Sequence, residues 1–97
     1  MSTDTSFRMT IADVFAIRGR GTVVTGRVES GTLNVGDEVY IKGPAGSKKT
    51  VVAAIEAFRA RLDRAAAGDN IGLLLQNIAR EDVQRGDIVT GRQDDQG

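Results

Sequence analysis

The side chains available for chemistry in this sequence are carboxylates, lysines and arginines. The 97 residues include no histidine and no cysteine. The chain therefore lacks the usual general base near neutral pH, the commonest metal ligand and any thiolate nucleophile. Beside the predicted turns, adjacent carboxylates occur at Asp37-Glu38 and at Glu81-Asp82. Because neighbouring residues of a strand point to opposite faces, neither pair is expected to share a substrate. We predict a protein that is not an enzyme and has no cofactor and no metal site.

The nearest approach to a nucleotide-binding loop is the segment Gly43 to Thr50, GPAGSKKT. The phosphate-binding loop of GTPases reads G-x-x-x-x-G-K-[ST], and its backbone amides surround the phosphates. Here the spacing of the glycines differs and no Gly-Lys pair is present, so we predict a polar hairpin loop. Hydrolysis of GTP would need a separate domain.

A candidate binding face follows from the alternation of residues near the start of the chain. Residues two apart in a strand share a face, so Ile11, Asp13, Phe15 and Ile17 are expected together. Val23 and Thr25 share a face of the following strand and are expected beside Phe15 and Ile17. Since burying an unpaired charge is costly, Asp13 indicates that this face is partly wet, with Phe15 as a stacking surface. Two alternatives stay open: that Phe15 belongs to the core, and that Asp13 pairs with an arginine.

Arginines gather near two of the predicted turns. Arg18 and Arg20 lie in a Gly-rich turn, and Arg59, Arg61 and Arg64 follow a strand further along the chain. Guanidinium groups suit phosphates and protein carboxylates equally, and solvated loops would carry the same residues. The 13 basic residues are balanced by 13 acidic ones, so any contact with RNA must be local.

The elements that must position these side chains are short strands. In Ile17–Ser30, IRGRGTVVTGRVES, Gly19 and Gly21 permit a tight turn and the β-branched residues that follow favour a strand. Gly26 predicts a bulge or a barrel bend. Six strands are predicted in all: Phe7–Ile17, Thr22–Glu29, Asp37–Lys42, Lys49–Arg59, Asn70–Ile78 and Asp87–Thr90. Such short strands indicate an antiparallel barrel or sandwich.

The segments between the strands are predicted as turns. Ala60–Ala67 contains good helix formers but is too short for a helix with a buried face, so we predict a loop with a single helical turn. Glu81–Gln84 is predicted as another turn. Gly-Asp occurs before three of the strands, where we expect each aspartate to bond its own backbone two residues on. These dipeptides are Gly36-Asp37, Gly68-Asp69 and Gly86-Asp87.

Length and composition indicate one small domain. We expect it to span residues 7–90, with mobile polar ends at 1–6 and 91–97. No apolar run reaches membrane-spanning length, and Met1–Ser6 lacks the regions of a signal peptide. A cytoplasmic location is therefore predicted.

The run DVFAIRGRGTVVTGRVESGTLNVGDEVYI resembles domain 2 of elongation factor Tu and its relatives among the translational GTPases. The segments IEAFR, AGDNIGLLL and RGD follow in the order of that family, and the resemblance extends from Phe7 to Thr90. It implies an all-β fold, a six-stranded antiparallel Greek-key β-barrel. It also implies a non-catalytic binding module with a role in translation elongation.

The resemblance further implies a set of site residues. In that family the barrel packs against a GTPase domain and receives the aminoacylated 3′ end of tRNA. Positions that line its amino-acid pocket match Asp13, Phe15 and Thr25, while Arg59 and Asn70 match positions near the acceptor end and the pocket. Positions around the terminal adenosine match Ile17, Gly19, Arg20, Val23, Glu56 and Leu74.

The resemblance assigns roles to several of these side chains. Glu56 is expected to bond the sugar of the terminal adenosine, with Arg20 and Arg59 near the phosphates. Ala12 departs from the pattern, because the family usually has a glutamate there. The alternative function is a protein-interaction module that kept the barrel and lost RNA binding, with a GTPase domain or a ribosomal component as its partner.

Overall fold

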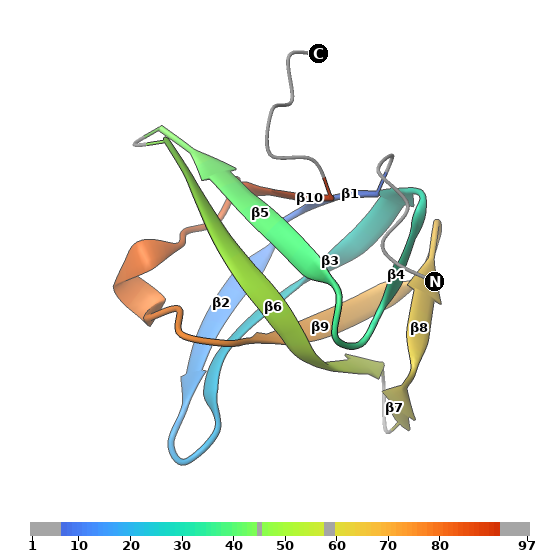
Figure 1. Ribbon diagram of the computed structural model, residues 1–97, viewed down its shortest axis with the longest axis horizontal. Helices are drawn as coiled ribbons and strands as arrows, with labels where there is room; N and C mark the ends of the chain where they lie inside the picture. The colour runs from blue at the N-terminus through green and yellow to red at the C-terminus, as the bar shows by residue number, and fades with distance from the viewer. Residues whose placement is uncertain (1–6, 45, 58–59, 92–97) are drawn as a thin grey trace.

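Six antiparallel strands close into a ring in the computed structural model, which describes residues 7–44, 46–57 and 60–91 (Figure 1). Around the ring the order is β1 (Arg8–Thr10), β10 (Ile88–Thr90), β5 (Glu38–Gly43), β6 (Gly46–Ala57), β9 (Asn70–Leu75) and β3 (Gly21–Ser30), and pairing of β3 with β1 closes it. Strand β10 returns beside β5 after the consecutive strands β5, β6 and β9, which is Greek-key order. The predicted barrel is confirmed.

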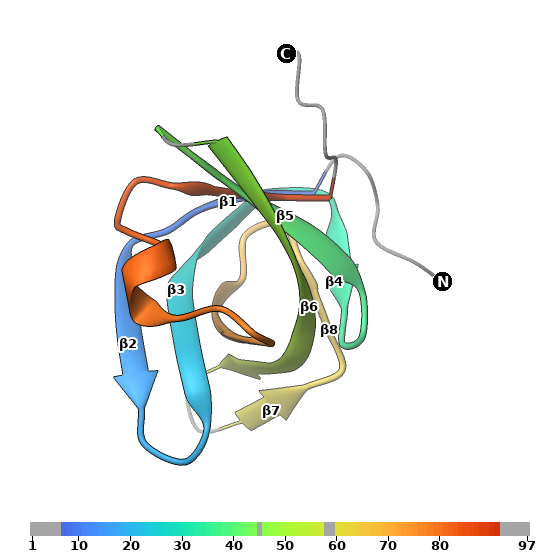
Figure 2. The same cartoon turned by 60° about the vertical axis from the view of Figure 1, so that its left-hand side comes forward.

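Further strands extend this ring. Strand β2 (Asp13–Ile17) pairs with β3, and β7 (Ala60–Leu62) pairs with the end of β6, as Figure 2 shows. Strands β4 (Thr32–Asn34) and β8 (Arg64–Ala66) form a separate two-stranded sheet. A single turn of 3-10 helix, η1 (Arg80–Asp82), lies where a turn was predicted at 81–84.

The predicted first strand, Phe7–Ile17, is wrong because the structure divides it into β1 and β2. The backbone N–H of Ile11 donates to the carbonyl of Asp87 at 2.8 Å, and Gly86 donates to the carbonyl of Ile11 at 2.9 Å. Ile11 is also fully buried. These bonds hold the chain at the point where it leaves the ring, so a continuous strand cannot form.

The prediction of a loop with a helical turn at Ala60–Ala67 is also wrong, because this segment contains β7 and β8. Each short strand is paired along its whole length, β7 with the end of β6 and β8 with β4. Strand partners outweigh a weak local preference for helix. β4 itself lies within 30–36, where only a turn was predicted, and β9 ends at Leu75, before the predicted limit at Ile78. The predictions for Phe58, Arg59 and the chain ends, Gly91 apart, concern residues outside those described.

The core fills the inside of the ring with alternate residues of its strands. In β9, Ile71, Leu73 and Leu75 are buried, and in β3 so are Val24 and Val28. The intervening residues of these strands point away from the core. These intervening residues form the outside of the barrel, where Val23 and Ala54 are nevertheless largely covered by their neighbours.

The ring closes where β1 crosses β3, and two local features permit the crossing. A Cβ atom on Gly26 would lie 2.4 Å from the carbonyl oxygen of Thr10, so only glycine allows this approach. The pairing then shifts by one residue, which leaves Glu29 as an extra residue in β3. The predicted bulge thus lies at Glu29, while Gly26 provides the close contact.

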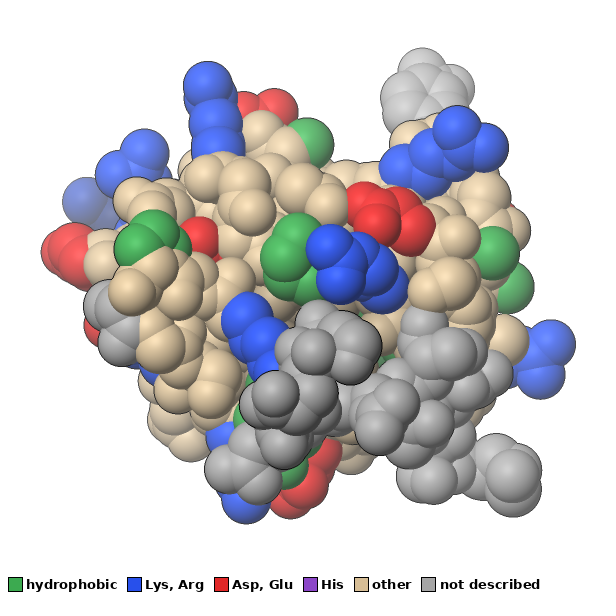
Figure 3. Space-filling model, turned by 90° about the horizontal axis from the view of Figure 1, so that it is seen from above, with side chains coloured by type: hydrophobic (Ala, Val, Ile, Leu, Met, Phe, Trp, Pro, Cys, Tyr) green, Lys and Arg blue, Asp and Glu red, His purple; other side chains and the backbone are tan. Residues whose placement is uncertain are grey.

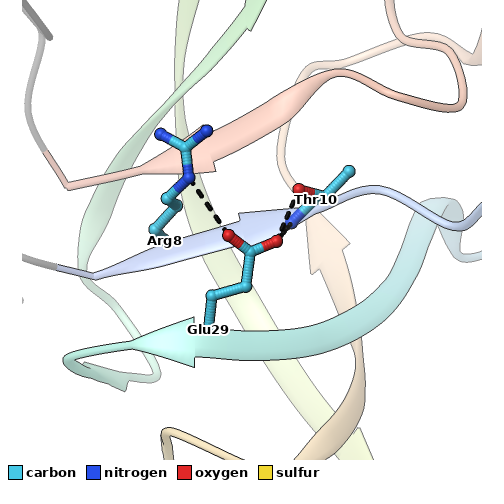
Figure 4. A network of polar contacts seen from close by, with 3 residues as sticks. All are labelled: Arg8, Thr10 and Glu29. Atoms are coloured by element: carbon cyan, nitrogen blue, oxygen red, sulfur yellow. Dashed lines mark hydrogen bonds and ion pairs between the residues drawn. The ribbon is translucent and has the colours of Figure 1, made fainter. Parts of the chain in front are cut away.

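Glu29 uses its bulged position to bind β1 (Figure 4). Its Oε2 accepts hydrogen bonds from the hydroxyl of Thr10 at 2.5 Å and from the Thr10 backbone N–H at 3.2 Å. Its Oε1 accepts one from Nε of Arg8 at 3.1 Å. The Thr10 hydroxyl, followed by Arg8, holds the pKa of Glu29 below its ordinary value. The carboxylate therefore links β1 to β3 most strongly when it is charged.

The three Gly-Asp turns share one geometry. In each, the glycine has positive φ and the aspartate carboxylate accepts a hydrogen bond from the backbone N–H three residues earlier. The expected bond to the backbone two residues on is therefore wrong. The donor–acceptor pairs are Asn34 with Asp37 at 2.9 Å, Ala66 with Asp69 at 2.9 Å and Gln84 with Asp87 at 3.1 Å.

Gly26→Ala tests the crossing of β1 over β3. The added methyl group collides with a backbone oxygen that cannot rotate away, so we expect a loss of about 1–3 kcal/mol in the free energy of unfolding, measured in urea. Gly72→Ala is the matched control, because its nearest neighbour is a side-chain methyl of Val23 at 3.3 Å. Equal stability of the two variants would contradict the steric role of Gly26.

Glu29→Gln tests the carboxylate link between β1 and β3. Because the pKa of Glu29 is lowered from 4.5 in the folded state, its contribution is present above that value and is lost as the pH falls through the folded pKa. We expect the variant to melt at a lower temperature at pH 7 and to converge with the parent as the pH falls below the folded pKa of Glu29, which is itself lower than 4.5. Glu81→Gln, at a side chain with no bond to the described residues, should change neither. Parallel melting curves for the parent and Glu29→Gln would contradict this role.

Candidate functional site

The predicted site residues that belong to described strands lie on the outer side of the sheet formed by β2, β3, β9, β6 and β7, and Gly19 and Arg20 lie in the turn between β2 and β3. We call the outer side of this sheet the outer face. Its central row joins directly opposed residues from all five strands, namely Asp13, Thr25, Gly72, Glu56 and Arg61. The next row contains Phe15, Val23, Leu74 and Ala54, and the row on the other side contains Arg27 and Asn70. The face thus brings together residues that are distant in sequence.

The side chains of β2 settle the two alternatives that the sequence left open. Phe15 is 49% exposed and Ile17 38% exposed, so the assignment of Phe15 to the core is wrong. Asp13 does pair with an arginine, since its Oδ1 lies 2.9 Å from Nη2 of Arg85. The register confirms the predicted place of Val23 beside Phe15, whereas Thr25 lies opposite Asp13 and not beside Ile17. Ile11, expected on the same face, is instead buried in the core. Among the predicted site residues, Arg59 alone lies outside those described.

A hollow opens in the outer face around Gly72. Its lining includes Thr25 and Glu56 on either side of the glycine, with Ala12, Arg27 and Asn70 further along. A Cβ atom on Gly72 would lie 3.3 Å from Val23 and 3.6 Å from Thr25, and a larger side chain would fill the space. Sequence reasoning missed this residue. The available signal was a glycine at an outward position within an otherwise apolar strand.

Arg20 reaches from the β2–β3 turn to the end of β6. Its Nη2 lies 2.7 Å from Oε2 of Glu56, and Nη2 of Arg61 lies 3.6 Å from the same oxygen. Oε1 of Glu56 has no hydrogen-bond partner among the described residues. The turn itself depends on Gly19, with φ of +82°, and on a hydrogen bond from the Arg20 N–H to the Ile17 carbonyl at 2.9 Å.

The arginines control the charge of Glu56. The hydrogen bond from Arg20 is the largest influence and, with the nearby charge of Arg61, it lowers the pKa of Glu56. The carboxylate is therefore ionised near neutral pH and held in place, and its Oε1 can accept a hydrogen bond from a ligand hydroxyl.

The outer face is cationic although the chain as a whole is neutral. Its carboxylates, Asp13 and Glu56, each have arginine partners, whereas Arg27 forms no ion pair with any described residue. The surface seen from above in Figure 3 differs in charge from the outer face, because basic and acidic side chains are mixed over its described part. Within the described ranges no three acidic residues gather to hold a metal ion, and no helix is long and apolar enough to cross a membrane.

A family model described as elongation factor Tu domain 2 matches residues 21–90. The chain belongs to the elongation factor Tu domain 2 family. The matched segment contains every strand of the ring except β1, together with the hollow residues Thr25, Glu56 and Gly72. β2 and the turn that carries Arg20 precede it. Their place beside the domain 2 barrel therefore rests on the strand register.

Arg20→Gln tests the electrostatic arrangement on this domain 2 surface. Loss of the guanidinium group removes the main cause of the lowered pKa, so the pKa of Glu56 should rise toward its ordinary value. The measurement is a pH titration of the Glu56 side-chain carboxyl carbon by NMR. Arg61→Gln is the graded control and should give a smaller rise in the same direction. An unchanged titration in Arg20→Gln would contradict the pairing.

Proposed function

We propose that this barrel is a non-catalytic binding module that contacts the aminoacylated 3′ end of tRNA in translation elongation. The observation that carries the proposal is the arrangement of the outer face, where the hollow around Gly72 adjoins the ionised carboxylate of Glu56. The membership in the elongation factor Tu domain 2 family supports the same function.

The chemistry of the outer face suits the parts of such a ligand. Oε1 of Glu56 would accept a hydrogen bond from a hydroxyl of the terminal ribose, and Arg20 would lie near a phosphate. The exposed ring of Phe15, in the row that continues to Val23 and Leu74, offers an apolar surface beside them. The hollow would then take the aminoacyl group.

The spacing of the strands also suits a terminal nucleoside with its amino acid. Glu56 in β6 and Asp13 in β2 are separated by three strand intervals, which amount to about 14 Å. A face of this width can contact the sugar and the aminoacyl group together. Because the barrel supplies a single wall of contacts, we expect weak binding by the barrel alone. A GTPase domain or a ribosomal component acting in trans in the cytoplasm would supply further contacts.

A second candidate function is protein interaction through β2. This strand pairs with β3 on one side, and no backbone hydrogen bond joins residues 13–17 to another described strand. An open strand edge with exposed Phe15 and Ile17 can accept an added strand from a partner. A partner that remains bound after nuclease treatment, and is lost on Ile17→Lys, would favour this function.

Titration of labelled protein with charged and uncharged tRNA tests the proposed function. We expect backbone amide shifts at Thr25, Glu56 and Gly72, larger with the aminoacylated form because it alone fills the hollow. The valine side chain of Gly72→Val would occupy the hollow. This variant should therefore show equal amide shifts with aminoacylated and uncharged tRNA. Ser47→Val is the control for a valine introduced elsewhere, since Ser47 is exposed in the first half of β6, away from the outer face.

Two results would contradict the proposal. The first is the absence of shifts at the outer face with either tRNA at high concentration. The second is an undiminished preference for charged tRNA in Gly72→Val, provided that the variant keeps the amide spectrum of a folded barrel.

A further inference from the structure

The hollow around Gly72 is rich in hydrogen-bond donors that have no partner among the described residues. Thr25, Arg27 and Asn70 line it, and none of their side chains has a hydrogen-bond or ion-pair partner among the described residues. Arg27 and Asn70 are directly opposed in β3 and β9, one row from Thr25 and Gly72. A guanidinium group, an amide and a hydroxyl are therefore free to donate into the same space.

The carboxylates near the hollow are already compensated. Glu56 lies at one side of the hollow with Arg20 at 2.7 Å and Arg61 at 3.6 Å, and Asp13, one strand beyond Thr25, has Arg85 at 2.9 Å. The charge of Arg27 is thus the one that remains uncompensated among the lining residues that the structure describes.

Ala12 lies at the edge of the hollow nearest to β2. Its backbone N–H donates to the carbonyl of Thr25 at 2.7 Å, which fixes its position, and its methyl group adds no charge. A longer acidic residue here would bring a negative charge to the hollow. The alanine therefore leaves the field of Arg27 unopposed at this edge.

We infer that this hollow selects an acidic aminoacyl group, an aspartyl or glutamyl side chain whose carboxylate is bound by Arg27 and Asn70. This inference rests on the proposed function and names the ligand class of the same site. A carboxylate is an acceptor-only group, so it matches the free donors of the hollow. A glutamine side chain offers these donors a single uncharged oxygen, and a lysine side chain is repelled by the charge of Arg27.

The test uses one RNA hairpin of acceptor-stem sequence that ends in 3′-amino-3′-deoxyadenosine, joined by a stable amide bond to glutamate, glutamine or lysine. Affinities for the whole chain are measured by NMR titration. We expect the glutamyl form to bind about threefold to fivefold more tightly than the glutaminyl form, the range of a partly exposed ion pair, and the lysyl form to bind most weakly. The ratio should decrease as salt is added.

Two exposed positions supply the variants. Arg27→Gln should give equal affinities for the glutamyl and glutaminyl forms. Ala12→Glu should reverse the order of affinities, so that the lysyl form binds most tightly and the glutamyl form most weakly. Arg64→Gln, in β8 away from the outer face, is the matched control and should keep the parent preference.

The outcomes separate this inference from the proposed function. Equal binding of all three forms, with shifts at Thr25 and Gly72, would overturn the inference and leave the function standing. Persistence of the glutamyl preference in Arg27→Gln would overturn the assignment to that residue. No shift with any of the three forms would overturn both.

Discussion

The crossing of β1 over β3 is the constraint on which the rest of the structure depends. At Gly26 the backbone of β1 comes so close that no side chain can be accommodated. β1 then pairs with β3 beyond this point, at Val28 and Ser30, whereas β2 pairs with the part before it, from Gly21 to Thr25. One edge of β3 thus pairs with β2 in its first half and with β1 in its second half, while the other edge pairs with β9.

Strand β6 is divided in a similar way. Its first half pairs with β5, and its second half pairs with β9 and β7 after an irregularity between Val52 and Ala54. The second half of β6 and the first half of β3 both pair with β9, and the short strands β2 and β7 widen the sheet there. This widening places Glu56 and Asp13 on one surface. The candidate site is a consequence of how the barrel closes.

The sequence predicts those parts of this arrangement that depend on local chemistry. Strand alternation placed Phe15 beside Val23, and the glycines indicated the β2–β3 turn. The break at Ile11 could not be predicted, because it depends on hydrogen bonds to residues 86 and 87, far along the chain. Strands β7 and β8 were missed for the same reason, since their own residues carry little preference for a strand.

Within the site, the limit of sequence reasoning was the pairing of side chains. The family resemblance assigned separate roles to Arg20 and Glu56, yet their contact depends on β9 lying between β3 and β6. The role of Gly72 depends likewise on its neighbours across two strands. Such features arise from register, and a single strand pattern contains no information about its partners.

Closure of the ring also determines when the barrel can fold. β1 lies between β10 and β3, so its residues pair with strands from both ends of the described chain. Contacts that join distant segments form slowly, because a long loop must first be closed. During synthesis, β1 must remain unpaired on one side until β10 has left the ribosome. The outer sheet of β2, β3, β9 and β6 contains no part of β10. The binding surface can therefore assemble before the barrel is complete.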